Sequence, residues 1–412
     1  MSDYAQRIHL LDLDRPSLVA LLESWGYSAF HAGQVWEHIY RRGARSIAGM
    51  DELRPDLRAR LEAETLLSLP EPVLSRRSAD GTEKVVLRLG DGEMVEAVLM
   101  PYRDRYTACI STQVGCAMGC VFCATGQMGF TRHLRPGEIV GQILYLQQVA
   151  QDEGRELRNV VFMGMGEPLH NYDATMTAVD ILTDDKGLAM APRHLTVSTV
   201  GLAPAIRRLA DEARPVNLAV SLHGATDAER RALVPVARRW SLAELMDACR
   251  YYVAKRGRRI FFEWTLIAGE NDTPEQAQAL GRLLQGLDAH VNLIPLNPTG
   301  DYGGAPSRRE AIAAFKAILD GYGEVASGPV AVPGWLPSAG AHERGQPPGR
   351  RGRRPGPAAG RPGGRRLHRR PRRGAPRPGG RGRPAPRAAA AGPPRARRRG
   401  RPRGGADPLL GP

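Results

Sequence analysis

The sequence has few cysteines and no long apolar run, and each shortage excludes a class of protein. Its five cysteines are an odd number and nothing near the N-terminus resembles a signal peptide, so a disulfide-stabilised secreted fold is disfavoured. No apolar run approaches the roughly 20 residues of a membrane-spanning helix. We therefore expect a soluble, cytoplasmic protein with no membrane partner, whose 412 residues form two or three domains.

Acids, lysines and aromatic residues are scarce in the last quarter of the chain. Residues 325–412 hold 22 arginines, no lysine and two acids, so this segment carries +20 while residues 1–324 carry −5. A segment composed mainly of Arg, Pro, Gly and Ala cannot bury a core. We therefore expect residues 324–412 to form a disordered tail, and the basic charge to belong to that tail.

The rest of the chain divides by its hydrophobic pattern. Residues 1–70 predict a small helical domain, because apolar residues such as Val35, Trp36 and Ile39 recur at helical spacing. Residues 71–104 predict a β ribbon with Asp-Gly turn signals between its strands. The ribbon strands are expected at 73–76, 84–89 and 94–100.

Residues 105–323 alternate between apolar strands and amphipathic helices. The expected strands are 108–112, 159–165, 194–200, 217–222, 260–267 and 291–296. The expected helices are 139–151, 174–183, 204–213, 242–255, 274–287 and 307–323. This alternation predicts a parallel sheet, and six such units predict an α/β fold with a partial (β/α)6 barrel of the TIM type. A doubly wound sheet is the alternative.

Three cysteines form the most distinctive pattern of the sequence. Cys116, Cys120 and Cys123 are separated by three and two residues in a glycine-containing loop. Clustered thiolates select zinc or iron–sulfur, and three thiolates can hold three irons of a four-iron cluster while the fourth iron stays open to a substrate. A structural zinc site would need a fourth ligand, for which Cys109 is one candidate and His133 a weaker one.

Polar and glycine residues recur where the expected strands end. In a barrel these ends share one rim, where ligands bind. Each residue alone is weak evidence, because a single glycine is usually a turn residue and a single histidine is usually structural. Together they could bind a sulfonium nucleoside, with glycines admitting it closely and Glu167 accepting from its ammonium group. The set comprises Gly166, Glu167, Ser198, Ser221, Leu222, His223 and Asn297.

Several segments resemble the RlmN/Cfr family, the radical S-adenosylmethionine (SAM) methyltransferases that modify carbon 2 of adenosine. The cysteine triad resembles the cluster motif of radical SAM enzymes in general, and Cys109 followed by Gln113-Val114-Gly115 narrows the resemblance to this family. The resemblance covers residues 7–323. The matching segments are TACISTQVGCAMGCVFCATGQMGF (107–130), GMGEPL (164–169), STVG (198–201), SLHGATDAERRALVP (221–235) and HVNLIPLNP (290–298).

The resemblance implies a mechanism and partners. In the family, one SAM methylates a cysteine near the C-terminus, and a second SAM is reduced by the cluster to a radical that activates this methyl group. The methylene adds to adenine, and a second cysteine releases the product as a disulfide forms. The resemblance assigns Cys109 as that second cysteine, Glu96 as proton acceptor and the triad as ligands of a 4Fe-4S cluster. It also implies 23S ribosomal RNA and tRNA as substrates and a flavodoxin or ferredoxin as electron donor, and we expect a monomer.

The sequence departs from the family after residue 323. No cysteine follows Cys249, which lies mid-helix on the expected outside of the barrel and is interpreted as a core thiol. Because the family pattern stops where its last cysteine motif is due, we interpret the tail as a frame-shifted reading of a GC-rich gene. The competing interpretation is an arginine-rich arm that binds RNA phosphates. DNA sequencing around codon 324 tests the frameshift, and an intact frame would contradict it.

Two other functions remain open from the residues alone. One is a radical SAM enzyme of another class, such as a glycyl-radical activase, against which Cys109 and the helical domain argue. The other is a non-enzymatic RNA-binding protein with a zinc knuckle and a basic arm. On the family resemblance we expect a chain that binds the cluster and cleaves SAM but does not complete methylation.

Overall fold

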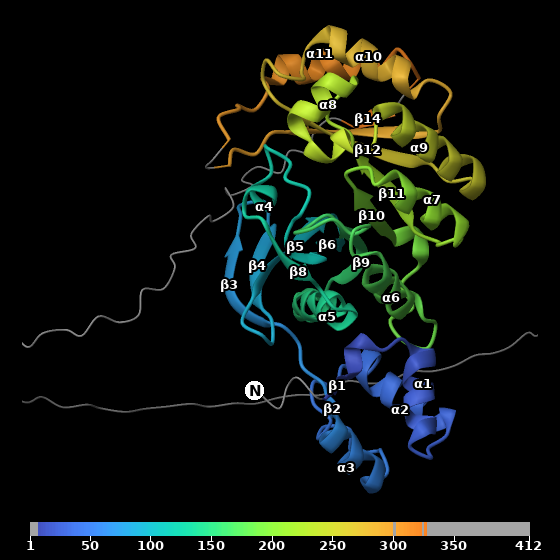
Figure 1. Cartoon of the computed structure of the whole chain (residues 1–412). Helices are drawn as coiled ribbons and strands as arrows, with labels where there is room; N and C mark the ends of the chain where they lie inside the picture. The colour runs from blue at the N-terminus through green and yellow to red at the C-terminus, as the bar shows by residue number, and fades with distance from the viewer. Residues whose placement is uncertain (1–6, 300–301, 324, 328–412) are drawn as a thin grey trace, which may run out of the picture. The chain divides into compact units, whose positions relative to one another are not determined.

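A computed structural model of the chain describes residues 7–299 and 302–323, together with the backbone of 325–327 (Figure 1). Its main element is a ten-stranded sheet with the order β14-β13-β12-β11-β10-β9-β6-β5-β4-β3. The strands are β3 (Glu71–Arg77), β4 (Glu83–Arg88), β5 (Met94–Tyr102), β6 (Arg105–Cys109), β9 (Glu156–Phe162), β10 (Leu195–Thr199), β11 (Asn217–Ser221), β12 (Ile260–Leu266), β13 (Ala289–Pro295) and β14 (Val325–Ser327).

From β6 to β14 the sheet is parallel and its strands follow chain order. Representative register pairs are Cys109 with Val161, Val197 with Phe162, and Ser221 with Glu263. A doubly wound sheet would reverse its strand order at a switch point, and this sheet has no such reversal. The expected partial barrel and its six strand–helix units are confirmed.

Helices follow the parallel strands, as Figure 1 shows for α5 to α11. They are α5 (Pro136–Asp152), α6 (Tyr172–Thr183), α7 (Ala203–Asp211), α8 (Asp227–Leu233), α9 (Leu242–Arg256), α10 (Pro274–Leu284) and α11 (Arg309–Asp320). The two ends of α9 are set by capping residues. Ser241 accepts from the backbone of Glu244 at its start, and Gly257 ends the helix in the left-handed conformation with φ of 58°. None of the described helices is both long and apolar enough to cross a membrane.

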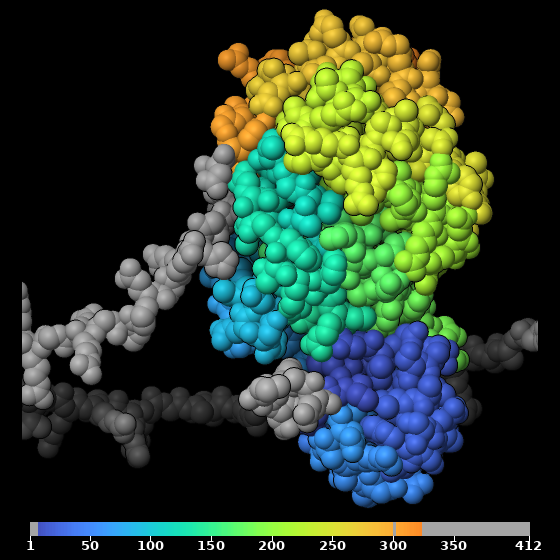
Figure 2. Space-filling model, viewed as in Figure 1, coloured from blue at the N-terminus to red at the C-terminus, as the bar shows by residue number. Residues whose placement is uncertain are grey.

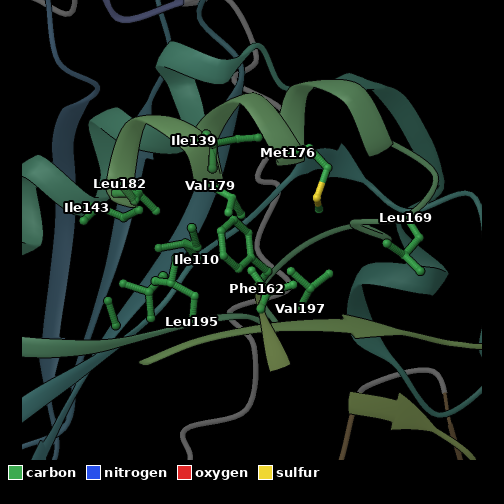
Figure 3. Packing of buried hydrophobic residues seen from close by; sticks show 14 of the residues in the cluster. Ile110, Ile139, Ile143, Phe162, Leu169, Met176, Val179, Leu182, Leu195 and Val197 are labelled. Carbon is green, nitrogen blue, oxygen red and sulfur yellow. The ribbon is translucent and has the colours of Figure 1, made fainter. Parts of the chain in front are cut away.

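The core lies between the sheet and these helices. Phe162 of β9 and Val197 of β10 are fully buried against Val179 and Met176 of α6 (Figure 3). Ile139 and other apolar residues of α5 extend the same layer. Burying one such side chain contributes roughly 1.5–3 kcal/mol, so the layer holds the strand ends in fixed positions.

The N-terminal region is helical, as the sequence predicts, and packs on the sheet domain (Figure 2). Its elements are β1 (Ile8–His9), a 3-10 turn (Leu10–Asp12), α1 (Arg15–Ser24), α2 (Ala29–Tyr40), α3 (Pro55–Glu64) and β2 (Thr65–Leu66). Arg15 pairs with Asp184 at 2.7 Å, and Asp12 accepts from the backbone nitrogen of Gly137 at 2.8 Å. These contacts attach the helices to the starts of α5 and of the loop after α6.

Two features differ from the sequence-based expectation. Strands β3, β4 and β5 form an antiparallel extension of the main sheet, since β5 pairs with β6. The expectation of an irregular tail from residue 324 is wrong for Val325–Ser327, which pair with β13 as strand β14. Strand pairing uses backbone groups, so the edge of β13 can pair with this short segment although an arginine-rich sequence follows it. Residues 328–412, and with them the frameshift and RNA-arm interpretations, lie outside the described residues.

Candidate functional site

The cysteine loop, residues 116–123, follows β6 and the short strand β7 (Gln113–Gly115), and leads into α4 (Ala124–Gln127). The loop is attached at both ends, because the backbone nitrogen of Cys116 donates to the oxygen of Gly129 at 2.7 Å and that of Val121 donates to the oxygen of Leu233 at 3.1 Å. Gly115 has φ of 72°, and a Cβ there would lie 2.0 Å from the Gly129 oxygen. Only glycine fits this turn.

The three thiols of the loop lie close enough to affect one another. Burial, together with the charges of Cys123 and Glu167, raises the pKa of Cys116 to about 11. Cys120, which is 7% exposed, has a pKa raised by burial and by both neighbouring thiols. Three thiolates gathered in this way repel one another unless a cation lies among them.

Within residues 7–299 and 302–323, no three His, Cys, Asp or Glu side chains converge tightly enough to hold a single metal ion. Neither Cys109 nor His133 is thus gathered with the triad into a four-ligand arrangement among these residues. Thiolates that each bind a different iron of a cluster need not converge on one point. The donor chemistry and spacing of Cys116, Cys120 and Cys123 fit a cluster better than a single ion.

Glu167 is a buried acid at the end of β9. It is 2% exposed, and its two carboxylate oxygens accept from the backbone nitrogens of Leu169 at 3.1 Å and Val200 at 2.8 Å. Burial raises the pKa of Glu167 to about 7, although these hydrogen bonds act in the opposite direction. The carboxyl group is therefore poised to lose its proton near neutral pH when a cation approaches.

Gly166 precedes this acid in a conformation that requires glycine. Its φ is 98°, and a Cβ would lie 2.5 Å from the Cβ of Gln113. The Gln113 side-chain oxygen accepts from the backbone nitrogen of Glu167 at 2.9 Å. The loop after β9 is thus fixed to the loop after β6, and Gln113 is a site residue that sequence reasoning missed.

His223 lies at the end of β11 in a strained backbone conformation, with φ of 59°. Its Nδ1 accepts from the backbone nitrogen of Thr265 at 3.0 Å, and its carbonyl accepts from Asn271 at 2.9 Å. Burial, aided by the charge of Arg230, lowers the pKa of His223 to about 3, so the ring is neutral. Its ring lies 4.8 Å from that of Phe122 in an edge-to-face contact, which joins this strand end to the cysteine loop.

Arg230 of α8 is a buried cation that sequence reasoning also missed. It is 1% exposed and donates to the carbonyl oxygens of Val200 and, at 3.2 Å, of Leu222. Its Nε has no hydrogen-bond partner among the described residues. Burial lowers its pKa to about 10, while the neighbouring Cys120 acts in the opposite direction. The guanidinium therefore joins two strand ends and places positive charge beside the cysteine loop.

The remaining predicted strand-end residues lie where the topology requires. Ser198 is 9% exposed in β10, and Ser221 is the last residue of β11. Leu222 is fully buried beside it. Asn297, after β13, keeps a buried side-chain nitrogen without a hydrogen-bond partner among the described residues. An unpaired buried amide is costly, and a ligand oxygen would satisfy it.

Glu263 of β12 is a third site residue that was missed. The neighbouring Trp264 contacts Phe315 of α11 with ring centroids 5.8 Å apart, so Glu263 points to the opposite, inner face of the barrel. Asn292 donates to its carboxylate at 2.9 Å, and burial raises its pKa to about 7. A lone acid within an apolar strand was the available sequence signal.

Cys109 and Glu96 lie on the neighbouring strands β6 and β5. Burial, together with the charge of Glu96, raises the pKa of Cys109 to about 12. Glu96 pairs with Lys84 at 2.8 Å, and its side chain is 29% exposed. Glu96 is thus a paired, half-buried acid near this thiol.

All five cysteines are free thiols, so the disulfide implied by the family mechanism is not formed. Cys249 is fully buried in α9, and burial raises its pKa to about 12. This confirms its interpretation as a core thiol on the helical layer.

Comparison with known proteins agrees with this geometry. Residues 110–280 match the model of the radical SAM superfamily. Residues 8–67 match the model described as the ribosomal RNA large subunit methyltransferase N-terminal domain.

Relatives that match about three quarters of the chain are also named as RNA methyltransferases. The chain is 61% identical over 315 residues to the dual-specificity RNA methyltransferase RlmN 1 of Myxococcus xanthus, covering 76% of this chain and 88% of the relative. It is 47% identical to the dual-specificity RNA methyltransferase RlmN of Anaeromyxobacter dehalogenans, covering 75% and 84%. A crystal structure of a radical SAM methyltransferase from Sphaerobacter thermophilus superposes with a TM-score of 0.76 at 46% identity, covering 78% of this chain and 95% of that one.

Proposed function

The chain belongs to the RlmN family of radical SAM RNA methyltransferases, and from that premise we propose that it binds a 4Fe-4S cluster and SAM and acts on carbon 2 of adenosine. The observation that carries the proposal is the position of three mutually interacting thiols beside Glu167 and His223. The names of its relatives favour RNA as the substrate class, with 23S ribosomal RNA and tRNA adenosines as the substrates.

Cys116, Cys120 and Cys123 would hold the cluster. When bound, the cluster supplies one electron to SAM through its open iron. The charge of Arg230 would offset that of the Cys120 thiolate, and Phe122 of the loop contacts the His223 ring. These contacts support a water-poor site, in which electrostatic interactions are strong.

The strand ends would hold SAM. Gly166 makes room for the Gln113 side chain that fixes the loop. Glu167 would accept from the ammonium group of the methionine part. Ser198, Ser221 and the Leu222–His223 segment would contact the ribose and the carboxylate, and the unpaired nitrogen of Asn297 would donate to the nucleoside.

Cys109 would serve as the resolving thiol and Glu96 as the proton acceptor. The raised pKa of Cys109 keeps this thiol protonated until a base approaches, and Glu96 is the acid whose charge acts on it. The Lys84–Glu96 pair holds the carboxylate on the neighbouring strand.

Completion of methylation requires a methyl-accepting cysteine, and no cysteine follows Cys249 in this sequence. Cys249 is fully buried on the helical layer, so it is a poor substitute. We infer that this chain cleaves SAM but does not turn over as a methyltransferase. We also propose domains at residues 1–70, 71–104 and 105–323, followed by a frame-shifted tail. The electron donor would be a flavodoxin or ferredoxin, and the chain would act as a monomer.

Anaerobic purification and chemical reduction test these statements together. The expected product is 5′-deoxyadenosine, formed from SAM in a brown, iron-containing protein. Mass spectrometry of treated ribosomal RNA fragments should detect no methyladenosine beyond one turnover per chain. A colourless, iron-free protein would contradict the cluster, and repeated turnover would contradict the inferred block.

A further inference from the structure

Three aromatic rings meet beside the cysteine loop. Phe130 and His133 belong to strand β8 (Phe130–His133), and His170 lies in the loop after β9. The centroid of the Phe130 ring is 5.2 Å from that of His133 and 5.9 Å from that of His170, and the two imidazoles are 4.9 Å apart. Phe130 remains 41% exposed, so its ring is available to a partner.

One amide holds the two histidines in place. The Gln113 side-chain nitrogen lies 3.0 Å from Nδ1 of His133 and 3.1 Å from Nδ1 of His170. An amide nitrogen has two hydrogens, so both imidazoles can accept as neutral rings with Nε2 protonated. Burial and the neighbouring His170 lower the pKa of His133, in agreement with a neutral ring.

The same rings are connected to both halves of the active site. The side-chain oxygen of Gln113 accepts from the nitrogen of Glu167 at 2.9 Å. The oxygen of Gly129, the residue before Phe130, accepts from the nitrogen of Cys116 at 2.7 Å. On the other side of Gly129, Met128 is 54% exposed. A partner on these rings would therefore lie next to the residues proposed to hold SAM and the cluster.

We propose that Phe130, His133 and His170 form a stacking platform for an unpaired RNA base that flanks the target adenosine. This inference rests on the proposed function and adds how the substrate is positioned. Unpaired bases stack on aromatic side chains, and neutral rings offer flat faces to a base rather than charge to a phosphate. The nearest cation of the strand, Arg132, is already engaged by Asp91 and Glu138.

The test uses the full chain and an RNA stem-loop that carries 2-aminopurine next to the target adenosine. The wild-type chain should quench the fluorescence of this base on binding. Phe130→Ala should abolish most of the quenching and weaken binding about tenfold, the effect of one lost stacking contact. Phe130→Trp should restore both. Residues 325–412 are identical in every variant, so any RNA binding by them is the same throughout the comparison.

A matched control is Phe30→Ala. Phe30 is 70% exposed on α2 and has its own histidine neighbour, His31, with ring centroids 5.8 Å apart. This variant should bind and quench as the wild type does. Equal losses in the two variants, or unchanged quenching in Phe130→Ala, would overturn the platform. Unchanged quenching with slower cluster reduction by flavodoxin would assign the surface to the electron donor and overturn it also.

The outcomes separate this inference from the proposed function. A chain that forms 5′-deoxyadenosine with dithionite but never quenches the flanking base contradicts the platform alone. A chain that quenches the base but forms no 5′-deoxyadenosine contradicts the proposed function and leaves the platform supported.

Discussion

The cysteine loop and the strand-end cradle, defined as Gly166, Glu167, His223 and Arg230, lie beside each other but are stabilised differently. In the cradle the polar side chains have internal partners: Glu167 accepts two backbone hydrogen bonds and His223 accepts one. In the cysteine loop the side chains that matter are three thiols whose main interactions with one another are unfavourable.

This difference separates a preformed site from one that its metal completes. The cradle is held by packing and hydrogen bonds of the protein alone, so we expect it to exist before ligand binds. The cysteine loop gathers three thiols whose thiolate forms repel one another unless a cation binds them, so its order should depend on the irons. Each prediction below changes one side of this comparison.

The largest expected effect is on the loop. Cys120→Ala should reduce the iron content of anaerobically reconstituted protein from about four per chain to almost none, because one thiolate is lost from a three-thiolate cluster. SAM cleavage should be lost with it. Iron analysis and visible absorbance measure this.

Cys249→Ala is the matched control. Its thiol is fully buried in α9, outside the cysteine loop, with Arg230 as a charged neighbour. Iron content should therefore stay unchanged while stability falls by about 1 kcal/mol. Equal iron content in the Cys120→Ala and wild-type proteins would show that the loop does not hold the cluster.

The second effect is on the cradle. Gly166→Ala would place a Cβ 2.5 Å from that of Gln113 at φ of 98°, so we expect a loss of about 2–3 kcal/mol in unfolding free energy from strain and overpacking. SAM affinity, measured by calorimetry, should fall about tenfold or more, or 1.4 kcal/mol.

Gly154→Ala separates strain from crowding. Gly154 has φ of 69° with no atom within 4 Å of the added Cβ. The Gly154→Ala variant should therefore lose only about 1 kcal/mol of unfolding free energy and keep its SAM affinity. If both variants lost the same stability and affinity, the close approach at Gly166 would have no role.

Much of the fold could be predicted because it depends on local patterns. The apolar period changes from helix to strand with little ambiguity, so the order of β6 to β13 follows from the sequence. Which strands join into one sheet could not be predicted in the same way. β5 joins β6 within one sheet, and the short β14 was obscured by the arginine-rich composition that follows it.

The site was predicted to the extent that topology places strand ends together. Glu167 and His223 lie in the loops after β9 and β11, and the sequence predicts them as site residues because its strand pattern ends close before them. Gln113, Arg230 and Glu263 were missed because their importance depends on burial and on side-chain direction. Arg230 lies on a helix with an exposed arginine, Arg231, next to it, and sequence cannot tell which one is buried.

The third prediction concerns the raised pKa of Glu167. The native chain keeps this proton to about pH 7, whereas the group releases it near its ordinary pKa of 4.5 when unfolded. Its contribution to stability is therefore present below about pH 4.5 and is lost as the pH rises towards 7. The wild type should therefore lose at most about 3 kcal/mol of unfolding free energy between pH 4.5 and 7 through this group, and Glu167→Gln should not show this loss.

Thermal unfolding of the two proteins between pH 4.5 and 7.5 measures the difference. The difference between the curves is needed because His223, with its lowered pKa, contributes a rise in stability with pH between about 3 and 6.5. SAM affinity of the wild type should also rise through pH 7, as the carboxylate forms, and that of Glu167→Gln should not. Parallel unfolding curves would contradict the raised pKa.

The fourth prediction tests the contact between the two regions. Arg230→Met removes a buried positive charge beside Cys120, which should make the cluster harder to reduce. We expect a midpoint potential about 60 mV more negative, a tenfold change in a one-electron equilibrium. Redox titration followed by electron paramagnetic resonance measures it.

Arg231→Met removes the adjacent exposed cation, whose side chain is 50% accessible and pairs with Asp227. Its potential should match that of the wild type, because solvent screens the charge. A shift of equal size in both variants would mean that only the net charge matters, and that the cradle does not act on the cluster through Arg230.

The smallest effect concerns a hydrogen bond that supports the loop. The Gln127 side-chain nitrogen donates to the oxygen of Val121 at 2.8 Å and to the hydroxyl of Thr299 at 3.1 Å. In iron-free protein, Gln127→Ala should cost about 1 kcal/mol and speed hydrogen exchange of the loop amides. With the cluster bound the difference should nearly vanish, because the irons then fix the same backbone. Gln148→Ala, which removes only an exposed bond to Asp152, should change neither state. If Gln127→Ala sped exchange equally with and without iron, the loop would be preformed like the cradle, and the two regions would not differ in the way their hydrogen bonds indicate.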